Sequence, residues 1–298
     1  LDSIKKKNLN LSNSFKLNII KEVSGHKNFP SSISLNKATI NSQEVKKGDI
    51  FFAIKGKKND GNKFVKQSFK RKASIAVVNR FQNSLNVRRQ IKVKNTLKFL
   101  TEISKTYRIN LNTRIIAVTG SCGKTTLKEL LGNSLKKIYK TSISPKSYNN
   151  KYGVPLSLFN LNHTDVYGVL EIGMDKKGEI DYLSKIVQQD ISVITNVNYA
   201  HVKNFKNINQ IALAKSEIIN NTKPNGSVVL NADDIFFKLH KKLSLKKNLT
   251  VISFGIKNLN SNIKLVNIQK MGKIYKIIIK IDQKKKSFLI SNNFQNNI

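Results

Sequence analysis

Short apolar runs alternate with stretches of helical spacing through most of the chain. Residues 115–118 (Ile-Ile-Ala-Val) are apolar without interruption, which is typical of a buried parallel strand. A helix is predicted over 124–138, where the apolar positions recur every three or four residues: Leu127, Leu130, Leu131, Leu135 and Ile138. Further strands are predicted within 166–174, 190–201 and 226–234. This order of strands and helices predicts an α/β domain with a doubly wound, mostly parallel sheet.

A smaller α/β domain is predicted before this sheet. Turns at Gly48-Asp49 and Asp60-Gly61 punctuate its hydrophobic pattern. The elements predicted there are a strand over 50–54, a helix over 64–72, a strand over 75–78 and a helix over 97–107. A polar link near 110–113 separates this N-terminal domain, residues 1–110, from the larger domain, residues 111–298.

The pattern changes again near the end of the larger domain. Residues 263–268, 274–281 and 287–290 alternate apolar and polar side chains, as half-exposed strands do. Turn signals lie between them, at Met271-Gly272 and over 282–285. The alternation therefore predicts an antiparallel extension of the parallel sheet.

The composition fits a protein with real hydrophobic cores that works in a reducing compartment. Hydrophobic residues make up 39% of the 298 residues, yet no run is long enough to cross a membrane. A single cysteine, Cys122, cannot form an internal disulfide, so we expect a cytoplasmic protein. The chain starts at Leu1 rather than at methionine, and we expect the sequence to be incomplete at that end.

The net charge of +37 raises the alternative of a nucleic-acid-binding protein. The lysines are spread through every segment, however, and form no arginine-rich or aromatic-interleaved stripe that would read bases. We interpret them as solvated lysine faces and expect no nucleic-acid partner. A highly anionic substrate would still be attracted by this field.

Candidate chemistry begins at residues 119–126, Thr-Gly-Ser-Cys-Gly-Lys-Thr-Thr, between the first strand and the first helix of the larger domain. Glycines here allow close backbone approach to a polyphosphate, and the amides that open the helix point at its oxygens. Lys124 is placed to reach the β- and γ-phosphates, and Thr125 to bind magnesium. Val118 stands where the general Walker motif has glycine, and a simple glycine turn is the alternative. We predict a nucleoside triphosphate site formed by Gly120, Ser121, Cys122, Gly123, Lys124, Thr125 and Thr126.

Polar residues follow other predicted strands at the same edge of the sheet. Glu171 ends the strand within 166–174, where a carboxylate near Thr125 is a reasonable magnesium ligand; a solvated glutamate is the alternative. His201 follows the next strand, although a lone histidine is more often structural. Asn149-Asn150 is equally compatible with an ordinary turn, and Lys215 with one more surface lysine.

Taken together, these segments resemble the Mur ligases and folylpolyglutamate synthase, which join a carboxylate to an amine through an acyl phosphate. The phosphate loop matches both. The Lys-Gly-Asp-Ile-Phe-Phe-Ala-Ile-Lys-Gly stretch at 47–56 resembles the N-terminal domain of the Mur ligases, which folylpolyglutamate synthases lack. Three further motifs resemble the Mur ligases that add D-alanyl-D-alanine: Asn149-Asn150 with Gly153-Val-Pro155, Glu171-x-Gly-Met174 and Ala214-Lys-x-Glu217.

The resemblance implies roles for individual residues. The N-terminal domain would hold the UDP end of the substrate, with Ser42 as the one matched residue where the family commonly has Asp-Ser-Arg. Asn149 and Asn150 would line the muramoyl and phosphate region. Two magnesium ions would be held by Thr125, Glu171, His201 and a carbamylated Lys215, and Lys124, Lys215 and His201 would be the catalytic set. Asn293 and Asn296 would contact the adenine of ATP.

The resemblance also implies an activity: ATP-dependent addition of D-alanyl-D-alanine to UDP-N-acetylmuramoyl-tripeptide in peptidoglycan precursor synthesis, by a monomer. Another Mur ligase or folylpolyglutamate synthase is the close alternative, and a basic nucleic-acid-binding P-loop protein is the alternative of another class. The family's C-terminal domain is absent from these residues, and we expect this fragment to have little or no ligase activity by itself.

Overall fold

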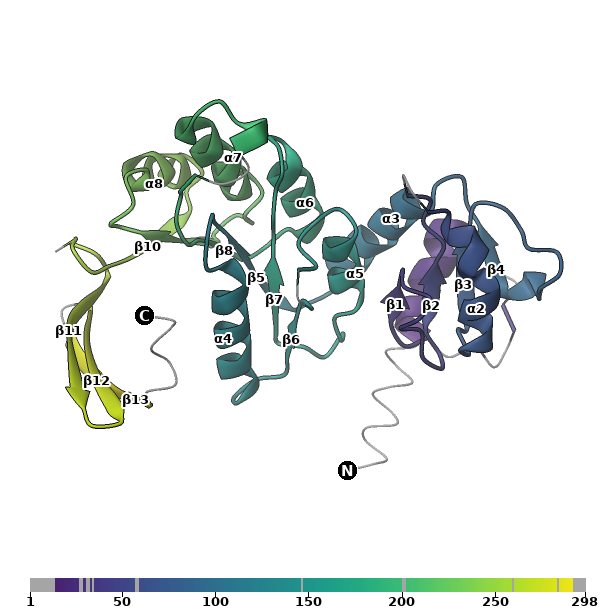
Figure 1. Cartoon of the computed structure of the whole chain (residues 1–298), viewed down its shortest axis with the longest axis horizontal. Coiled ribbons are helices and arrows are strands. Elements are labelled where there is room, and N and C mark those ends of the chain that lie inside the picture. Colours follow the sequence, from purple (N-terminus) through teal and green to yellow (C-terminus); the bar gives the residue numbers. More distant parts are fainter. Residues whose placement is uncertain are drawn as a thin grey trace. The chain divides into compact units, whose positions relative to one another are not determined.

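The structure is a computed structural model that describes residues 14–291 apart from 27–28, 31–32, 34, 57–58, 146, 200–201, 259 and 283. The chain forms two compact units (Figure 1). The first comprises Leu1–Thr113 and Lys151–Asp165, and the second comprises Arg114–Asn150 and Val166–Ile298. The first unit is thus discontinuous in sequence, which the polar link near 110–113 did not indicate.

The described residues of the first unit form a four-stranded parallel sheet in the order β1-β2-β3-β4. Its strands are β1 (Ala38–Thr39), β2 (Ile50–Phe52), β3 (Ile75–Val78) and β4 (Gln90–Lys92). Residues 14–24 of this unit are helical, and its further helices are η1 (Gly61–Phe64), α2 (Val65–Lys70), η2 (Val87–Arg89), α3 (Thr96–Ile109) and α5 (Gly153–Phe159). The predicted strand over 75–78 and the helix over 97–107 are confirmed, whereas the strand predicted over 50–54 ends earlier, at Phe52.

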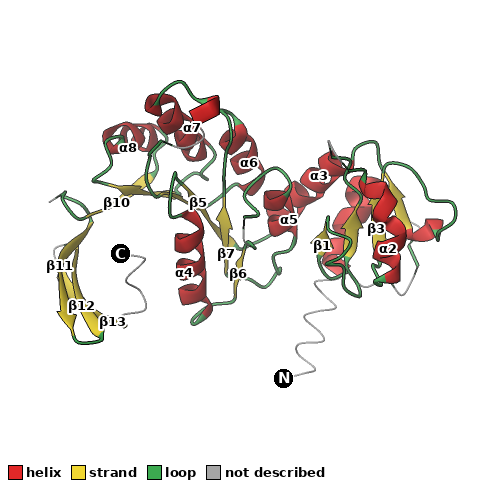
Figure 2. Cartoon of the chain, in the orientation of Figure 1, coloured by secondary structure: helices red, strands yellow, loops and turns green. Residues whose placement is uncertain are grey.

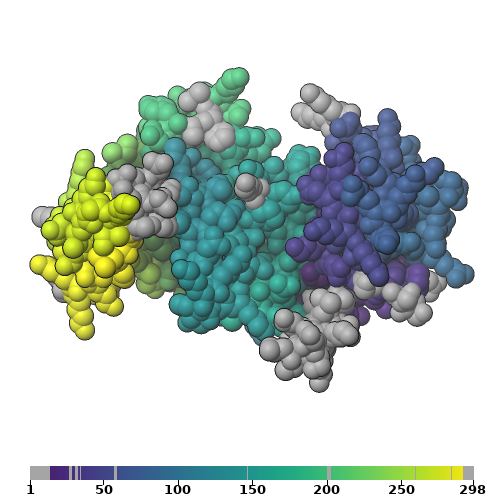
Figure 3. Space-filling view, turned by 60° about the horizontal axis from the view of Figure 1, so that its bottom comes forward, coloured from purple at the N-terminus to yellow at the C-terminus, as the bar shows by residue number. Residues whose placement is uncertain are grey.

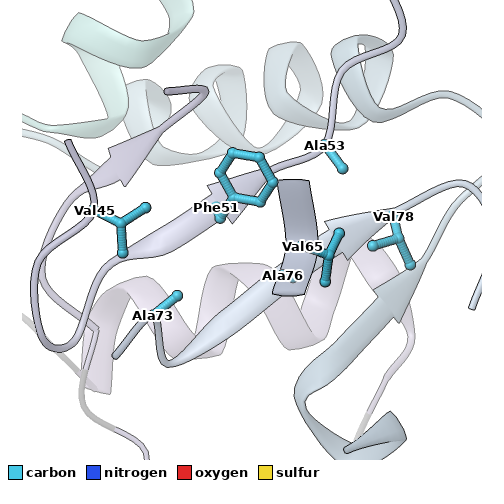
Figure 4. Close-up of a cluster of buried hydrophobic side chains, with 7 residues drawn as sticks. All are labelled: Val45, Phe51, Ala53, Val65, Ala73, Ala76 and Val78. Atoms are coloured by element: carbon cyan, nitrogen blue, oxygen red, sulfur yellow. The ribbon is translucent and has the colours of Figure 1, made fainter. Parts of the chain in front are cut away.

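One hydrophobic cluster of this unit draws its side chains from β2, β3, the start of α2 and the segments beside them (Figure 4). Phe51 of β2 and Ala76 of β3 lie beside Val65, the first residue of α2. The full cluster is Val45, Phe51, Ala53, Val65, Ala73, Ala76 and Val78. These fully or nearly fully buried side chains explain why such a short helix is stable, since packing rather than length stabilises short helices.

Segment 151–165 joins the first unit through α3. Ser104 Oγ donates to the Pro155 carbonyl oxygen at 2.9 Å, and Tyr107 Oη donates to that of Leu161 at 2.6 Å. Asn160 pairs with the backbone of Ala38 in β1, donating at 2.9 Å and accepting at 2.7 Å. The sequence motif Asn149-Asn150 with Gly153-Val-Pro155 is therefore divided, its asparagines in the second unit and its Gly-Val-Pro in the first.

Lys16 is an unusual member of the first unit's core, because it is 3% exposed. Its Nζ donates to the Asn36 carbonyl oxygen at 3.2 Å and lies 5.6 Å and 5.5 Å from the ring centres of Tyr107 and Phe159. Burial, and secondarily the charge of Lys37, lowers the pKa of Lys16 from 10.5 to about 8. Burying this ammonium costs stability, and the two aromatic rings together with the negative charges of Asp165 and Asp49 offset the cost only in part.

Lys16→Met is therefore expected to stabilise the fold by about 1–3 kcal/mol at neutral pH. Between pH 8 and 10.5 the unfolded wild-type chain binds a proton here that the folded chain lacks, so wild-type stability rises with pH across this window. The stability of the Lys16→Met variant should lack this contribution to the increase with pH. Urea unfolding at pH 7 and at pH 10 measures both effects, and Lys66→Met, at an exposed position of α2, is the control. Equal pH dependence in all three proteins would contradict the assignment.

The described residues of the second unit form a nine-stranded sheet in the order β13-β12-β11-β10-β9-β8-β5-β7-β6. Its strands are β5 (Arg114–Thr119), β6 (Thr141–Ile143), β7 (Tyr167–Glu171), β8 (Ile191–Ile194), β9 (Ser227–Asn231), β10 (Thr250–Gly255), β11 (Ile263–Met271), β12 (Ile274–Ile281) and β13 (Lys284–Ser291). All pairs from β6 to β11 are parallel, and the pairs β11-β12 and β12-β13 are antiparallel. The predicted fold class is confirmed.

Helices cover both faces of the parallel part of this sheet (Figure 2). They are α4 (Lys124–Lys136), α6 (Glu179–Val187), η3 (Val202–Asn204), α7 (Ile208–Asn220) and α8 (Phe237–Lys246). Leu127, Leu131 and Leu135 of α4 pack on Ile116 and Val118 of β5. The alternate β5 residues point to the other face, where α6, α7 and α8 lie. Within the part of the chain that the structure describes, no helix combines the length and apolar character needed to cross a membrane.

Strands β11–β13 extend the sheet beyond its helical layers (Figures 1 and 3). The predicted strands are present, but every residue of β12 is half-buried, so burial along β12 does not alternate. The predicted turns are confirmed at Gly272, whose φ is +62°, and at Asp282, whose φ is +43°. β12 has the predicted bounds, whereas β11 and β13 are longer than predicted, because exposed polar side chains weaken the hydrophobic signal at their ends.

Candidate active site

The phosphate loop (residues 119–126) connects β5 to α4 at the carboxyl edge of the sheet. Gly123 caps α4 with a φ of +78°, and Gly120 has a φ of +149°. A Cβ at Gly120 would lie 1.9 Å from Thr195 Oγ1, so a larger residue cannot replace this glycine without moving the loop. Lys124 Nζ donates to the carbonyl oxygens of Gly120 at 2.9 Å and Ser121 at 3.1 Å. The ammonium is thus held over the loop that would cradle the phosphates.

Thr125 and Glu171 meet at this edge, as predicted from the order of the strands. Thr125 Oγ1 donates to Glu171 Oε2 at 2.7 Å, and Asn149 Nδ2 donates to Glu171 Oε1 at 2.8 Å. Glu171 is 1% exposed, and no cationic side chain within the described ranges forms an ion pair with it. The Glu171 carboxylate and the Thr125 hydroxyl supply oxygen atoms of the kind that Mg²⁺ prefers, and the Asn149 amide orients the carboxylate.

Lys215 of α7 is 2% exposed. Burial, and secondarily the positive charge of Lys124, lowers the pKa of Lys215 from 10.5 to about 7. The side chain therefore lies within electrostatic reach of the phosphate loop, and a substantial fraction of it is neutral at pH 7. This environment is that of a reactive lysine rather than of a solvated surface lysine.

Glu217, in the same motif as Lys215, has a structural task. Its two carboxylate oxygens accept from Gly178 N at 2.8 Å and Asp181 N at 3.0 Å, which caps the start of α6. The bonds join α6 to α7. They hold the part of α7 that carries Lys215 against the start of α6.

The remaining predicted site residues differ in their surroundings. Ser42 is 6% exposed and its Oγ donates to Gln67 Oε1 at 2.7 Å, so its hydroxyl is engaged within the first unit. Asn150 is exposed and Thr126 is exposed at the start of α4. His201, Asn293 and Asn296 lie outside the described residues, and so their predicted roles stay predictions.

Sequence reasoning missed Lys128, which is fully buried in α4. Its Nζ donates to the Ser144 carbonyl oxygen at 2.8 Å, and Ser144 Oγ in turn accepts from Glu171 N at 3.2 Å. Lys128 thus supports the backbone beside Glu171 and Asn149. Its position between Leu127 and Leu131 in the helical pattern could have indicated burial, but the abundance of lysine hid that signal.

The fold and this geometry define an α/β P-loop protein whose sheet edge combines a phosphate loop, a buried carboxylate and a buried lysine of lowered pKa. Comparison with known proteins agrees: residues 118–295 match the model of the Mur ligase middle domain, and residues 35–108 match that of the Mur ligase family catalytic domain. The chain belongs to the Mur ligase family.

Relatives within the family share one description. The UDP-N-acetylmuramoyl-tripeptide–D-alanyl-D-alanine ligase of Buchnera aphidicola from Acyrthosiphon pisum is 35% identical over 226 residues, which cover 75% of this chain and 48% of that protein. The ligase of the same description from Bacillus subtilis is 34% identical, over 65% of this chain and 42% of its own length. The chain spans about half the length of the curated relatives it matches.

Solved structures give the same relationship. A crystal structure of MurF from Acinetobacter baumannii has a TM-score of 0.79 at 28% identity, over 92% of this chain and 59% of that one. MurF from Thermotoga maritima in complex with ADP has a TM-score of 0.74 at 28% identity, over 88% of this chain and 60% of that one. The folylpolyglutamate synthase of L. casei, at 13% identity and a TM-score of 0.52, shares the fold alone.

Proposed function

We propose that this chain provides the substrate- and ATP-binding parts of a ligase that joins D-alanyl-D-alanine to UDP-N-acetylmuramoyl-tripeptide. The observation that carries the proposal is the contact of Thr125 with Glu171 beside Lys124, in a chain whose relatives have that description. This arrangement brings a phosphate loop, a cation ligand and the Lys124 ammonium to one point of the sheet edge. In the proposed role, the first unit holds the UDP end of the substrate, and Ser42 orders its turn through Gln67.

The reaction we propose has two steps. A carboxylate oxygen of the tripeptide attacks the γ-phosphorus of ATP, and ADP leaves with the electron pair of the broken P–O bond. The amine of D-alanyl-D-alanine then attacks the acyl carbon, loses a proton and expels inorganic phosphate. The chain's residues orient the anions and offset their repulsion: the amides at the start of α4 and Lys124 face the phosphates, and Asn149 orients Glu171.

Magnesium would neutralise phosphate charge when bound, and two positions are proposed for it. Glu171 and Thr125 fit the first, as their contact indicates. The second would use His201 and a carbamylated Lys215. Carbamylation requires a neutral amine, and the lowered pKa of Lys215, about 7, supports it. We place the reaction in the cytoplasm and expect a monomer, with Asn293 and Asn296 contacting the adenine.

Glu171→Gln is expected to raise the Mg²⁺ concentration needed for half-maximal nucleotide affinity by about 10- to 100-fold. Glutamine keeps the size of the side chain and one acceptor oxygen, but it removes the charge that attracts the cation. Titration of ADP affinity against Mg²⁺ measures the effect, and Glu102→Gln, at a half-exposed position of α3, is the control. A folded Glu171→Gln protein with wild-type Mg²⁺ dependence would remove Glu171 from the proposed metal site.

The substrate is tested with the full gene product. Phosphate release from ATP should require both UDP-N-acetylmuramoyl-tripeptide and D-alanyl-D-alanine. Release with single amino acids or with folate and glutamate would keep the ligase class and reject the substrate. Tight, salt-sensitive binding to nucleic acid without phosphate release would reject the proposal altogether.

A further inference from the structure

The segment that follows β8, residues 195–198, lies along the first half of the phosphate loop. Its first backbone hydrogen bond, from Thr195 N to the Thr119 carbonyl oxygen at 3.0 Å, continues the parallel pairing of β5 with β8. Ser121 N then donates to the Asn196 carbonyl oxygen at 3.0 Å. Ser121 Oγ donates to the Asn198 carbonyl oxygen and accepts from Asn198 N, both at 2.8 Å. The loop is therefore laid against a neighbouring strand end rather than free in solvent.

The side chain of Asn196 bonds to both backbone groups of Cys122, its N–H and its carbonyl oxygen. Asn196 Oδ1 accepts from Cys122 N at 3.0 Å, and Asn196 Nδ2 donates to the Cys122 carbonyl oxygen at 3.2 Å. Thr195 Oγ1 donates to the same carbonyl oxygen at 2.7 Å. The amides of Ser121 and Cys122 are thus both directed at Asn196. For Ser121 N and Cys122 N to contact phosphate as predicted, their bonds to Asn196 would have to break. If these bonds persist, the phosphates bind to other amides of the loop.

The residue after Asn196, Val197, is held by a residue that follows the next strand of the sheet. Asp234, which follows β9, accepts from Val197 N at 2.7 Å through Oδ2 and from Phe236 N at 2.8 Å through Oδ1. Val197 is buried, so the segment has an anchor on the side away from the loop. A chain of contacts therefore runs from Asp234 through residues 196–197 to Cys122.

The first turn of α4 supplies the phosphate-binding donors that remain. Its amides have no partner within the helix, by the geometry of every helix start, and the helix dipole favours anions there. We propose that Asn196 is a positioning residue for nucleotide binding. It holds Ser121 and Cys122 against the sheet, so that the loop presents the amides from Gly123 onward, together with Lys124, in the geometry that binds a polyphosphate. This inference rests on the proposed nucleotide site.

Cys122 provides a test that is independent of catalysis, because it is the only cysteine of the chain and is exposed. Asn196→Ala removes both side-chain bonds to the Cys122 peptide, and we expect thiol alkylation of the nucleotide-free chain to become about fivefold faster or more. Asn198→Ala is the matched control. Asn198 bonds to Ser121 through its backbone, and within the described part of the chain its side chain accepts from Tyr199 N alone, at 2.7 Å. The alkylation rate of the Asn198→Ala chain should therefore stay at the wild-type value.

Nucleotide affinity provides the second readout. The affinity of Asn196→Ala for ADP should fall about tenfold, whereas Asn198→Ala should bind ADP as the wild type does. Asp234→Asn, which leaves one acceptor oxygen for two donors, should change both readouts in the same direction but less, and it serves if Asn196→Ala does not fold. Wild-type alkylation of folded variants would overturn the inference. Faster alkylation with unchanged ADP affinity would overturn the positioning role as well. Absence of ADP binding by the wild type would instead reject the proposed nucleotide site.

Discussion

Lys124→Ala is expected to lower the affinity for ATP, and the catalytic efficiency of the full gene product, by about 10²- to 10³-fold without unfolding the protein. Among the described residues, the ammonium donates to the carbonyl oxygens of Gly120 and Ser121 alone. Because Lys124 and Ser121 are only half-buried, water can replace these bonds in the variant. Nothing replaces the lysine when a triphosphate brings its negative charges into the loop. Isothermal titration with ATP and ADP, together with a melting curve, measures both halves of the expectation.

The control for Lys124 must separate a local contact from the general positive field of the chain. Lys136→Ala removes the same charge from the exposed C-terminal end of α4. It should change ATP affinity little, and any change should vanish at high salt, because exposed charges are screened. A comparable loss of affinity in both variants would show that the net charge of +37, and not the placement of Lys124, attracts the nucleotide.

Much of the second unit could be predicted because its signals are local. A buried parallel strand needs only a short apolar run, and the phosphate loop needs glycines and a lysine at fixed spacing. The position of Glu171 beside Thr125 could also be predicted, because neighbouring parallel strands end at the same edge of a sheet and the phosphate loop begins at that edge. For this reason the sequence alone predicted the pair that carries the proposed function.

Other features depend on which segments meet in space, and no local pattern specifies that. The return of 151–165 to the first unit is fixed by the bonds of Ser104 and Tyr107 with α5 and its following turn. In the same way, Lys16 and Lys128 are buried because aromatic rings or backbone carbonyls surround them in the fold. In a chain with 54 lysines and arginines, Lys16 has no distinguishing sequence signal, and the helical position of Lys128 is a weak one that the other lysines hide.

The contact of Asn196 with Cys122 is intermediate between these cases. Asn196 lies in the stretch 190–201, which was predicted to contain a strand, and the carboxyl ends of such strands are where α/β proteins carry functional groups. What the sequence lacks is the neighbour: β8 pairs with β5 although many residues separate them, and only that pairing brings Asn196 to the phosphate loop. Strand order therefore had to be known before this residue could be given a role.

Lys215→Ala is expected to lower ligase activity of the full gene product by about 10²- to 10³-fold, and short carboxylates such as formate or acetate should restore part of it. The proposed carbamate places a negative charge at the end of this side chain. Alanine removes the charge and leaves space in a buried site, because Lys215 is 2% exposed. A small carboxylate can occupy that space and supply the missing oxygens. Turnover at increasing formate concentration, against sodium chloride at equal ionic strength, measures the rescue.

Lys215→Met is the companion variant that separates charge from space. Methionine fills the site with an uncharged chain, so we expect the same loss of activity and no rescue. Because burial lowers the pKa of Lys215 to about 7, replacing the amine should leave the melting temperature unchanged or raise it. Rescue of both variants would show that the carboxylate acts outside this site, and wild-type turnover in either would remove Lys215 from the mechanism. Loss of activity in both variants without rescue in Lys215→Ala would assign Lys215 the role of a neutral amine or a cation, since a carbamate is the form that a carboxylate can replace.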